Sequence, residues 1–179
     1  FTSMEASLRR SDPPIAIVLM GVAGSGKTTL GLALAERFGL AFYDADDFHP
    51  PANVAKMSAG IPLNDDDRAP WLDRLAELLH DSIAKGRSVA LACSALKRRY
   101  RDRLREGCPG ILFVHQVGDR DMIAERMKRR TDHYMPPSLL DSQFAALELP
   151  DTDESVLTLD GTEPPEVLVD KVVARLAQA

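Results

Sequence analysis

A glycine-rich turn between an apolar segment and a helical pattern constrains this chain more than any other feature. The octapeptide Gly21-Val22-Ala23-Gly24-Ser25-Gly26-Lys27-Thr28 matches the pattern G-x-x-x-x-G-K-[ST]. The apolar run Ile15–Met20 precedes it, and a helical pattern begins at Thr29. This order of strand, loop and helix is the context that a phosphate-binding loop requires, because the glycines let backbone N–H groups curl inward. All eight residues are predicted to bind a nucleoside triphosphate.

Two side chains of this loop carry specific chemistry. Lys27 is expected to reach the β- and γ-phosphates and to act as a catalytic group. The Thr28 hydroxyl is expected to be a ligand of Mg²⁺, and the following helix adds its positive N-terminal end.

Length and charge narrow the class of protein. A chain of 179 residues is long enough for one α/β domain and too short for two. A net charge of −5 leaves no basic surplus for nucleic acid, and no apolar stretch is long enough to span a membrane. Cys93 and Cys108 form neither a disulfide framework nor a metal-ligand pattern. These features predict a cytoplasmic chain with no nucleic-acid or membrane partner.

The pattern of apolar runs predicts the fold class. Five short runs alternate with helical segments, at Ile15–Met20, Leu40–Tyr43, Ser88–Cys93, Ile111–Val117 and Ser155–Leu159. Runs of this length are typical of parallel strands buried on both faces. Helices are expected at Thr29–Phe38, at Trp71–Ala84, from Asp119 to about Arg130, and from Pro165 onward. We predict a three-layer α/β fold with a doubly wound parallel sheet of about five strands, the P-loop kinase fold.

The same pattern sets the domain boundaries. Residues 15–179 are expected to form a single domain. Residues 1–14, with Phe1–Ser3 ahead of Met4, are interpreted as a loose leader that includes residues left from cloning.

Carboxylates follow the second predicted strand. Asp44 and Asp46 lie two residues apart, so they project to the same side if the chain stays extended. One of the two carboxylates is expected to hold a Mg²⁺-bound water while the other contacts a substrate hydroxyl. Because the third strand ends without an acidic residue, the Mg²⁺ role is assigned to Asp44. Phosphoryl transfer to an alcohol needs both positioning and charge neutralisation. A solvated acidic turn is the alternative interpretation.

The segments after the third and fourth strands refine the class. The third strand ends in Cys93-Ser94-Ala95-Leu96-Lys97, without the acidic residue that many ATPases carry there, and no N-K-x-D segment is present. Both absences argue against a motor protein or a switch GTPase. Arg126 and Arg130 lie four residues apart on one predicted helix face, and His133 follows one turn later. Such arginines can stabilise a transferring phosphoryl group, although a basic solvated face is the alternative.

At this point the chain resembles the gluconate kinases (gluconokinases) of the small P-loop type, relatives of shikimate and adenylate kinases. The matching segments are GVAGSGKT at Gly21–Thr28, DADDFHPPANVAKMSAGIPLNDDDRAPWL at Asp44–Leu72, CSALKRRYRDRLR at Cys93–Arg105, RMKRRTDHYMP at Arg126–Pro136 and SQFAALELP at Ser142–Pro150. They cover almost everything from Ile15 to the last strand. Tyr134, where phenylalanine is common, is a small departure.

The resemblance implies ATP-dependent phosphorylation of the 6-hydroxyl of D-gluconate, with Mg²⁺ as cofactor and a possible homodimer. It implies that Asp46 holds or deprotonates the acceptor hydroxyl and that Arg68 binds the substrate carboxylate, since a guanidinium gives two parallel hydrogen bonds. The acceptor-binding region would span about 44–72 and a lid about 126–137, in which Arg130 is catalytic and Arg126 contacts the nucleotide. Further substrate contacts are expected from a set of polar side chains: His49, Lys56, Lys97, Arg101, His133 and Gln143.

Several alternatives stay open at this stage. His49 can equally cap a backbone carbonyl, and the acidic turn at Asp65–Asp67 is interpreted slightly more readily as a helix cap than as a substrate contact. Another small hydroxylated acid, such as shikimate, or a nucleoside monophosphate is the alternative acceptor. A nucleotide-binding regulator without catalytic activity is the alternative of a different class.

Overall fold

The computed structural model describes residues 13–128 and 137–178. Its strands are β1 Ala16–Met20, β2 Ala41–Asp44, β3 Val89–Ala92, β4 Leu112–Val117 and β5 Leu157–Asp160. Its helices are α2 Lys27–Phe38, α3 Pro51–Ser58, α4 Asp65–Ala84, α5 Arg98–Gly107, α6 Arg120–Lys128, α7 Pro137–Ala146 and α8 Pro165–Ala177, with short 3₁₀ turns η1 Ala45–Phe48 and η2 Thr152–Glu154.

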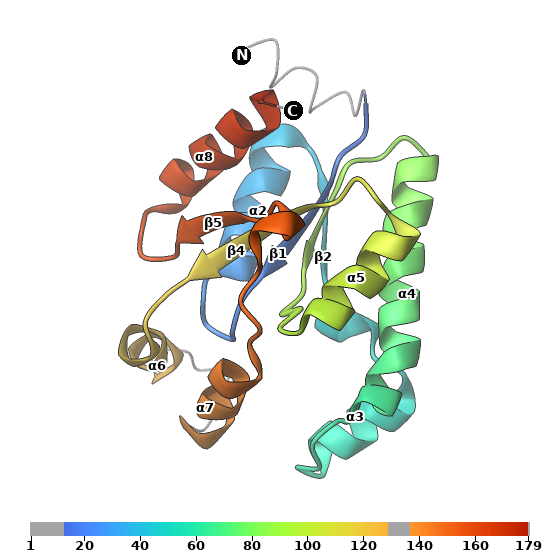
Figure 1. The fold of residues 1–179 in the computed structure, drawn as a ribbon, viewed down its shortest axis with the longest axis vertical. Coiled ribbons are helices and arrows are strands. Elements are labelled where there is room, and N and C mark those ends of the chain that lie inside the picture. The colour runs from blue at the N-terminus through green and yellow to red at the C-terminus, as the bar shows by residue number, and fades with distance from the viewer. Residues whose placement is uncertain (1–12, 129–136, 179) are drawn as a thin grey trace.

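The five strands form one parallel sheet in the order β2-β3-β1-β4-β5 (Figure 1). Every strand pair is parallel, and Val18 at the centre of β1 lies beside Leu91 of β3 and Phe113 of β4. The predicted fold class, a doubly wound parallel sheet, is therefore confirmed. All five strands were expected from the apolar runs, and their bounds differ from the prediction by one or two residues.

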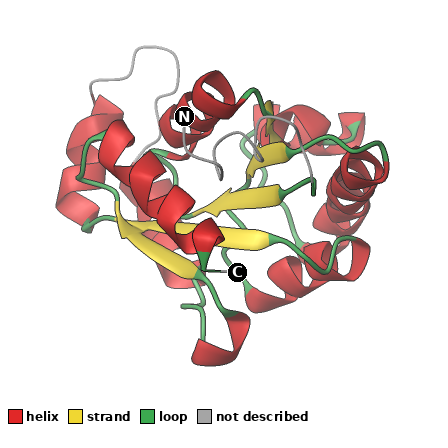
Figure 2. Cartoon of the chain, turned by 90° about the horizontal axis from the view of Figure 1, so that it is seen from above, coloured by secondary structure: helices red, strands yellow, loops and turns green. Residues whose placement is uncertain are grey.

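Helices cover both faces of the sheet, which explains the continuous apolar character of the strands. Side chains alternate along β1: Val18 and Met20 face the core under α4 and α5, whereas Ile17 and Leu19 face the core under α2 and α8. Figure 2 shows the strands between these two helical layers. Cys93, at the end of β3, is buried in the first core, and its N–H donates to the carbonyl of Leu19.

A smaller apolar cluster lies at the carboxyl end of the sheet. It joins Val22 of the glycine-rich loop to Ile123 and Met127 of α6 and to Leu140 of α7. In Figure 1, α3, α6 and α7 all lie at this end of the molecule. The ligands of open α/β sheets bind at this edge, so these helices border the region in which a site is expected.

Several helices differ from the sequence-based expectation. The helices α3, α5 and α7 were not anticipated, and α4 begins at Asp65 rather than at Trp71. The earlier start has a physical cause: Asn64 and Asp67 form a reciprocal capping box, and the helix continues through Pro70 in its second turn. Asp119 accepts a hydrogen bond from Met122 N–H at the start of α6, as expected of a cap. The continuation of that helix to Arg130 lies outside the described residues.

Among the described residues, none of the helices combines the length and apolar character needed to cross a membrane.

Candidate active site

The glycine-rich loop connects β1 to α2 at the centre of the sheet edge. Gly24 and Gly26 have φ angles of 78° and 102°, which an L-residue rarely adopts, so both glycines are needed for the curl of the loop. Lys27 is the first residue of α2, and its Nζ donates to the carbonyls of Gly21 and Val22 at 2.9 and 3.0 Å. Thr28 follows in the first turn of α2, at the positive end of the helix. The predicted phosphate-loop residues thus form one concave turn.

Two contacts from distant segments hold this loop. Gly21 N–H donates to the carbonyl of Ser94, in the segment after β3, at 3.2 Å. Ala23 N–H donates to Oε1 of Gln143 on α7 at 2.6 Å. Gln143 was expected to contact the substrate, and the structure instead places its carboxamide against the loop backbone.

Asp44 and Asp46 do not lie on an extended segment. The chain turns into η1 directly after β2, and Oδ1 of Asp44 accepts a hydrogen bond from Asp46 N–H at 2.9 Å. The assumption that extended geometry sends both carboxylates to one side was therefore wrong. Both still lie at the carboxyl end of β2, and the electrostatic influence of Lys27 reaches Asp46. The loop lysine and the Asp46 carboxylate are therefore close enough to influence each other electrostatically.

The Asp46 carboxylate is poised to accept a proton. Its side chain is 85% exposed and lies, with His49 and Arg68, in the expected acceptor region, here called the cleft. Neighbouring groups displace part of the water around the carboxylate and so raise the pKa of Asp46; Asp44 raises it further, whereas His49 and Lys27 act in the opposite direction. The net result is a carboxylate that is more basic than an ordinary aspartate.

The residues expected to hold Mg²⁺ fit such an ion chemically. No cluster of three or more His, Cys, Asp or Glu side chains is present among the residues the structure describes. Mg²⁺ rarely uses such a cluster, because it retains waters and binds through one or two protein oxygens together with phosphates. The Thr28 hydroxyl at the start of α2 and the Asp44 carboxylate at the end of β2 are oxygen donors of the required kind.

His49 is held in a fixed orientation beside Asp46. Its side chain is 5% exposed and stacks on Trp71, with ring centroids 4.5 Å apart and planes at 11°. Trp71 Nε1–H donates to the carbonyl of Ala45 at 2.7 Å, which fixes the indole. The ring nitrogens of His49 face Asn53 Nδ2 at 3.1 Å and Asp46 Oδ1 at 3.9 Å. Both neighbours are side-chain atoms, so these contacts do not support the alternative role of His49 as a cap of a backbone carbonyl.

Arg68 lies at the other side of this cleft, in the second turn of α4. Its side chain is 31% exposed, and Nη1 donates to the hydroxyl of Tyr100 at 3.3 Å. That hydroxyl in turn donates to Asp65 Oδ1 at 2.6 Å, and Arg99 forms an ion pair with the same carboxylate. The hydrogen bond from Tyr100 lowers the pKa of Asp65, with help from Arg99, Lys97 and Arg68. The guanidinium of Arg68 is thus held by Tyr100 and Asp65 through Nη1 and remains partly accessible to solvent.

The other lysines near this cleft have different surroundings. Lys56 Nζ donates to both carboxylate oxygens of Asp67 at 2.8 and 3.0 Å. The interpretation of the acidic turn as a helix cap is confirmed for Asp67, whose Oδ2 accepts from Asn64 N–H. Lys97 is half-buried at the start of α5.

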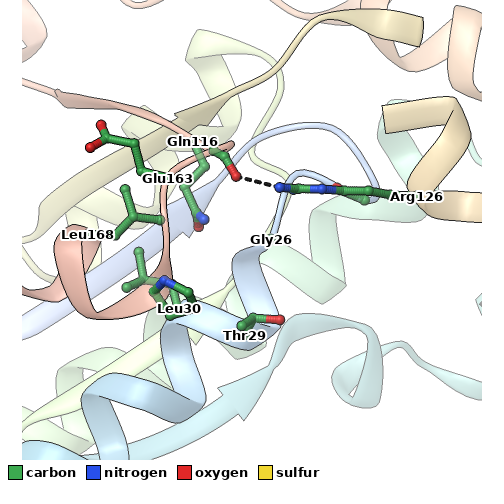
Figure 3. A pocket seen from close by; sticks show the side chains of 10 residues that line it. Gly26, Thr29, Leu30, Gln116, Arg126, Glu163 and Leu168 are labelled. Carbon is green, nitrogen blue, oxygen red and sulfur yellow. Dashed lines mark hydrogen bonds between the residues drawn. The ribbon is translucent and has the colours of Figure 1, made fainter. Parts of the chain in front are cut away.

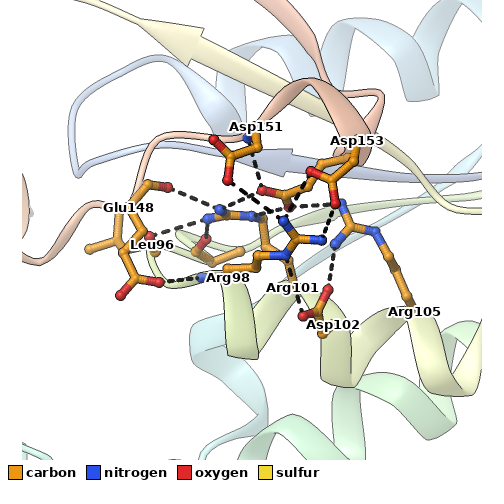
Figure 4. Close-up of polar contacts among 10 residues, drawn as sticks. Leu96, Arg98, Arg101, Asp102, Arg105, Glu148, Asp151 and Asp153 are labelled. Atoms are coloured by element: carbon orange, nitrogen blue, oxygen red, sulfur yellow. Dashed lines mark hydrogen bonds and ion pairs between the residues drawn. The ribbon is translucent and has the colours of Figure 1, made fainter.

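Arg101 does not lie in the cleft. Its side chain is 0% exposed and forms a two-bonded ion pair with Glu154, at 2.8 and 3.0 Å. Its remaining donors contact the carbonyls of Ala95, Leu96 and Glu148 (Figure 4). The expectation that Arg101 contacts substrate does not fit this placement, because its guanidinium is enclosed and occupied by groups of the chain itself.

The carboxylate of Glu154 is the centre of this buried ion cluster, which also includes Arg105 (Figure 4). Burial alone would raise the pKa of Glu154, but hydrogen bonds from Arg101 and Arg105 outweigh it and lower the pKa to about 2. The cluster ties the segment before β5 to the segment after β3, which carries Ala95 at a φ of 45°. It therefore supports the same segment whose Ser94 carbonyl holds the phosphate loop.

A second cleft, of about 320 Å³, adjoins the phosphate loop (Figure 3). Its lining includes Gly26, Leu30, Gln116, Glu163 and Leu168. Its walls therefore come from the loop, α2, β4 and the β5–α8 connection.

Arg126 is one of the residues that line this cleft. Its Nη2 donates to the carbonyl of Gly161 at 2.6 Å, and Nη1 lies 3.4 Å from the carbonyl of Gly24 (Figure 3). Arg126 was expected at the nucleotide site, whereas Gln116 and the β5–α8 connection were not. The position of Gly161 just beyond the last strand, at the same sheet edge, was the signal that pointed there.

Two predicted site residues, Arg130 and His133, and most of the lid expected at 126–137 lie outside the described residues.

Comparisons with known proteins identify the family of this chain. The family model of shikimate kinase matches residues 23–176. The gluconokinase of Gluconobacter oxydans is 46% identical over 160 residues, which cover 89% of this chain and 90% of that protein. The thermosensitive gluconokinase of Escherichia coli is 49% identical over 137 residues, which cover 76% of this chain and 73% of that protein. The crystal structure of a gluconokinase from Sinorhizobium meliloti, 46% identical, superimposes with a TM-score of 0.81 over 92% of this chain and 93% of its own. The chain belongs to the gluconokinase family of small P-loop kinases.

Proposed function

We propose that this protein is an ATP-dependent gluconokinase, which phosphorylates the 6-hydroxyl of D-gluconate to give 6-phosphogluconate and ADP. The observation that carries the proposal is the match, over most of the chain, to proteins named gluconokinase at 46% and 49% identity. The site supports it independently, because a phosphate loop faces a carboxylate of raised pKa and an accessible arginine.

The transfer step assigns a role to each side of the cleft. As the oxygen of the 6-hydroxyl forms its bond to the γ-phosphorus, the bond from that phosphorus to the departing ADP oxygen breaks. Asp46 accepts the hydroxyl proton, and its raised pKa suits that task. Lys27 compensates the charge on the phosphoryl oxygens, as preorganised cations do in such transfers.

Mg²⁺, when bound, neutralises phosphate charge during the transfer. Thr28 and Asp44 are the residues that would hold it.

The nucleoside half of ATP is assigned to the cleft beside the phosphate loop. A volume of about 320 Å³ lies within the range of small-molecule sites, and its lining mixes apolar groups such as Leu30 and Leu168 with polar ones. Arg126 already contacts both the loop and the Gly161 carbonyl, so it is placed to contact the base or the phosphates. This assignment supports the expected role of Arg126 in nucleotide binding.

The carboxylate of gluconate is assigned to Arg68. Tyr100 anchors one edge of that guanidinium and leaves other donors accessible, which favours a bidentate contact with a planar carboxylate. Lys56, Lys97 and His49 supply further polar groups at the cleft for the hydroxyls of the open-chain acid.

A coupled assay of ADP release tests the proposal across gluconate, shikimate, AMP and related sugar acids. Gluconate is expected to give the highest kcat/KM. A higher value with shikimate or AMP would assign the same chemistry to another acceptor. Tight ATP binding without turnover on any acceptor would instead indicate a nucleotide-binding regulator.

Two expectations about the intact protein accompany the proposal: a homodimer and a cytoplasmic location. Light scattering on the purified protein measures the first, and cell fractionation measures the second.

A further inference from the structure

A buried asparagine near the acceptor side of the cleft makes two hydrogen-bond contacts through its amide nitrogen. Asn53 lies on α3 and is 3% exposed. Its Nδ2 donates to the backbone carbonyl of Asp67 at 2.9 Å and lies 3.1 Å from Nδ1 of His49. Asn53 therefore connects the start of α4 to the histidine beside Asp46.

The chemistry of these contacts fixes the direction of both hydrogen bonds. The carbonyl of Asp67 can only accept, so the Asn53 atom that faces it must be the amide nitrogen. That nitrogen carries two hydrogens, and the second faces the His49 ring. Nδ1 of His49 must then accept with its lone pair, which leaves the ring proton on Nε2.

Other contacts support a neutral ring in one orientation. Burial lowers the pKa of His49, and Arg68 lowers it further, while Asp46 opposes them. Stacking on Trp71 fixes the ring plane. A neutral imidazole with a fixed plane and a fixed tautomer presents a single N–H donor, at Nε2.

The donor faces the carboxylate expected to act as base. Nε2 lies 3.9 Å from Asp46 Oδ1, too far for a direct hydrogen bond. Two successive hydrogen bonds of about 2.8 Å each exceed this separation, so one hydroxyl oxygen can contact both atoms at once. Nε2–H would donate to that oxygen, and Asp46 would accept its proton.

We propose that Asn53 is a positioning residue that holds His49 as an Nε2–H donor, and that His49 uses this donor to orient the acceptor hydroxyl against Asp46. The proposal rests on the proposed function for the identity of the acceptor. It gives His49 no role as a general base, since its Nδ1 lone pair is occupied by Asn53.

The tautomer can be measured without turnover. In the full-length protein labelled with ¹⁵N-histidine, the signals of His49 are assigned by their loss in His49→Gln. At neutral pH we expect Nδ1 to show the shift of an unprotonated nitrogen and Nε2 that of a protonated one. A proton on Nδ1, or a doubly protonated ring, would overturn the proposal whether or not gluconate is the substrate.

Asn53→Asp tests the source of the tautomer. A carboxylate of the same shape cannot donate to Nδ1, so the His49 proton is expected to move to Nδ1. The kcat should fall by about tenfold or more, with the KM for ATP changed by less than about twofold. Asn64→Ala is the matched control, because it removes an asparagine cap from the same end of α4 without touching His49 and should leave the ¹⁵N pattern unchanged. A wild-type pattern in Asn53→Asp would refute the assignment of Asn53.

A pair of His49 variants tests the position of the donor. Glutamine places an amide N–H close to the former Nε2, whereas asparagine places it close to the former Nδ1. We expect His49→Gln to retain kcat within about threefold and His49→Asn to lose about tenfold or more. Equal losses in both variants would show that the Nε2 donor does not orient the acceptor.

Discussion

The buried ion cluster around Arg101 and the open cleft around Arg68 use the same chemical groups in opposite ways. In the cluster, the guanidinium of Arg101 has carboxylate and carbonyl partners from its own chain and is 0% exposed. In the cleft, Arg68 donates to Tyr100, lies 3.9 Å from a carboxylate oxygen of Asp65 and keeps 31% of its side chain exposed. An arginine whose partners all come from the chain stabilises the fold, whereas one with accessible donors can bind a ligand.

The same contrast separates the carboxylates. Hydrogen bonds from two arginines hold the pKa of Glu154 at about 2, so Glu154 stays ionised as a structural anion. Partial burial and the neighbouring Asp44 raise the pKa of Asp46, so Asp46 can accept a proton. Changes in the cluster should therefore alter stability, and changes in the cleft should alter catalysis.

Arg101→Met should have the largest effect, on stability alone. It leaves Glu154 buried with Arg105 as its remaining guanidinium partner, and loss of one member of a buried pair costs about 3–5 kcal/mol of the free energy of unfolding. Urea unfolding measures this loss. The KM values for gluconate and ATP should stay at wild-type levels at temperatures where the variant is folded. A raised KM for gluconate would contradict the distinction between a buried cluster that only stabilises the fold and a cleft that binds the substrate.

Lys27→Ala should do the reverse of Arg101→Met: it should lower activity and leave stability nearly unchanged. Removal of a key electrostatic donor lowers kcat by about a hundred- to thousandfold, while the urea midpoint moves little. Steady-state kinetics and urea unfolding of the same preparation measure both quantities. Retention of more than about a tenth of the wild-type kcat would mean that Lys27 does not stabilise the transferring group.

Glu154 should make stability depend on acid pH. Because its folded pKa, about 2, lies below the ordinary glutamate value of 4.5, the contribution of Glu154 is fully present above the unfolded pKa and is lost as pH falls toward the folded one. A depression of that size corresponds to about 3 kcal/mol. Unfolding free energies of wild type and Glu154→Gln, compared from about pH 5 to about pH 2, should converge by roughly that amount. Parallel pH profiles would contradict the low pKa.

Asp46→Asn should lower kcat by about a hundredfold and leave the affinity for ATP nearly unchanged, since it removes only the proton acceptor. Isothermal titration with a non-hydrolysable ATP analogue provides the affinity. Asp44→Asn is the matched control and should instead make activity depend more steeply on Mg²⁺. A loss of ATP binding in Asp46→Asn would identify that carboxylate as a metal or structural group.

Arg68→Met should have the smallest effect and act on the acceptor alone. The loss of one charge-assisted contact raises the KM for gluconate by about tenfold or more and spares the KM for ATP. An uncharged polyol acceptor should lose much less. Equal losses on the two acceptors would place Arg68 with Arg101, as a residue that supports the fold.

Much of the fold could be predicted from the sequence because buried parallel strands have a strong apolar signal. The helix α5 was missed because its sequence, RRYRDRLREG, has only Tyr100 and Leu104 as large apolar residues. The start of α4 was misplaced because its apolar pattern begins only at Trp71, whereas the capping box at Asn64 sets the start. In each case a few local side chains, rather than a periodic pattern, determine the element.

The candidate site was predictable where short motifs define it, and not where distant segments meet. The phosphate loop is a local sequence, and Asp46 follows a strand directly. Arg101 was misassigned because its partner Glu154 lies 53 residues further along the chain. The cleft beside the loop was missed because Gly161 contributes a backbone carbonyl, so only its position just after the last strand marks it in the sequence.

Cys93 at the end of β3 has a chemical consequence of its own. Complete burial raises the pKa of its thiol to about 12, so a reagent that needs a thiolate can reach it only when the centre of the sheet opens. Its labelling rate therefore reports how often the sheet opens at β3, which lies beside the strand that leads into the phosphate loop. A nucleotide that binds only the closed form should lower the labelling rate. A thiol without a catalytic role can therefore report how much the ligand stabilises the sheet.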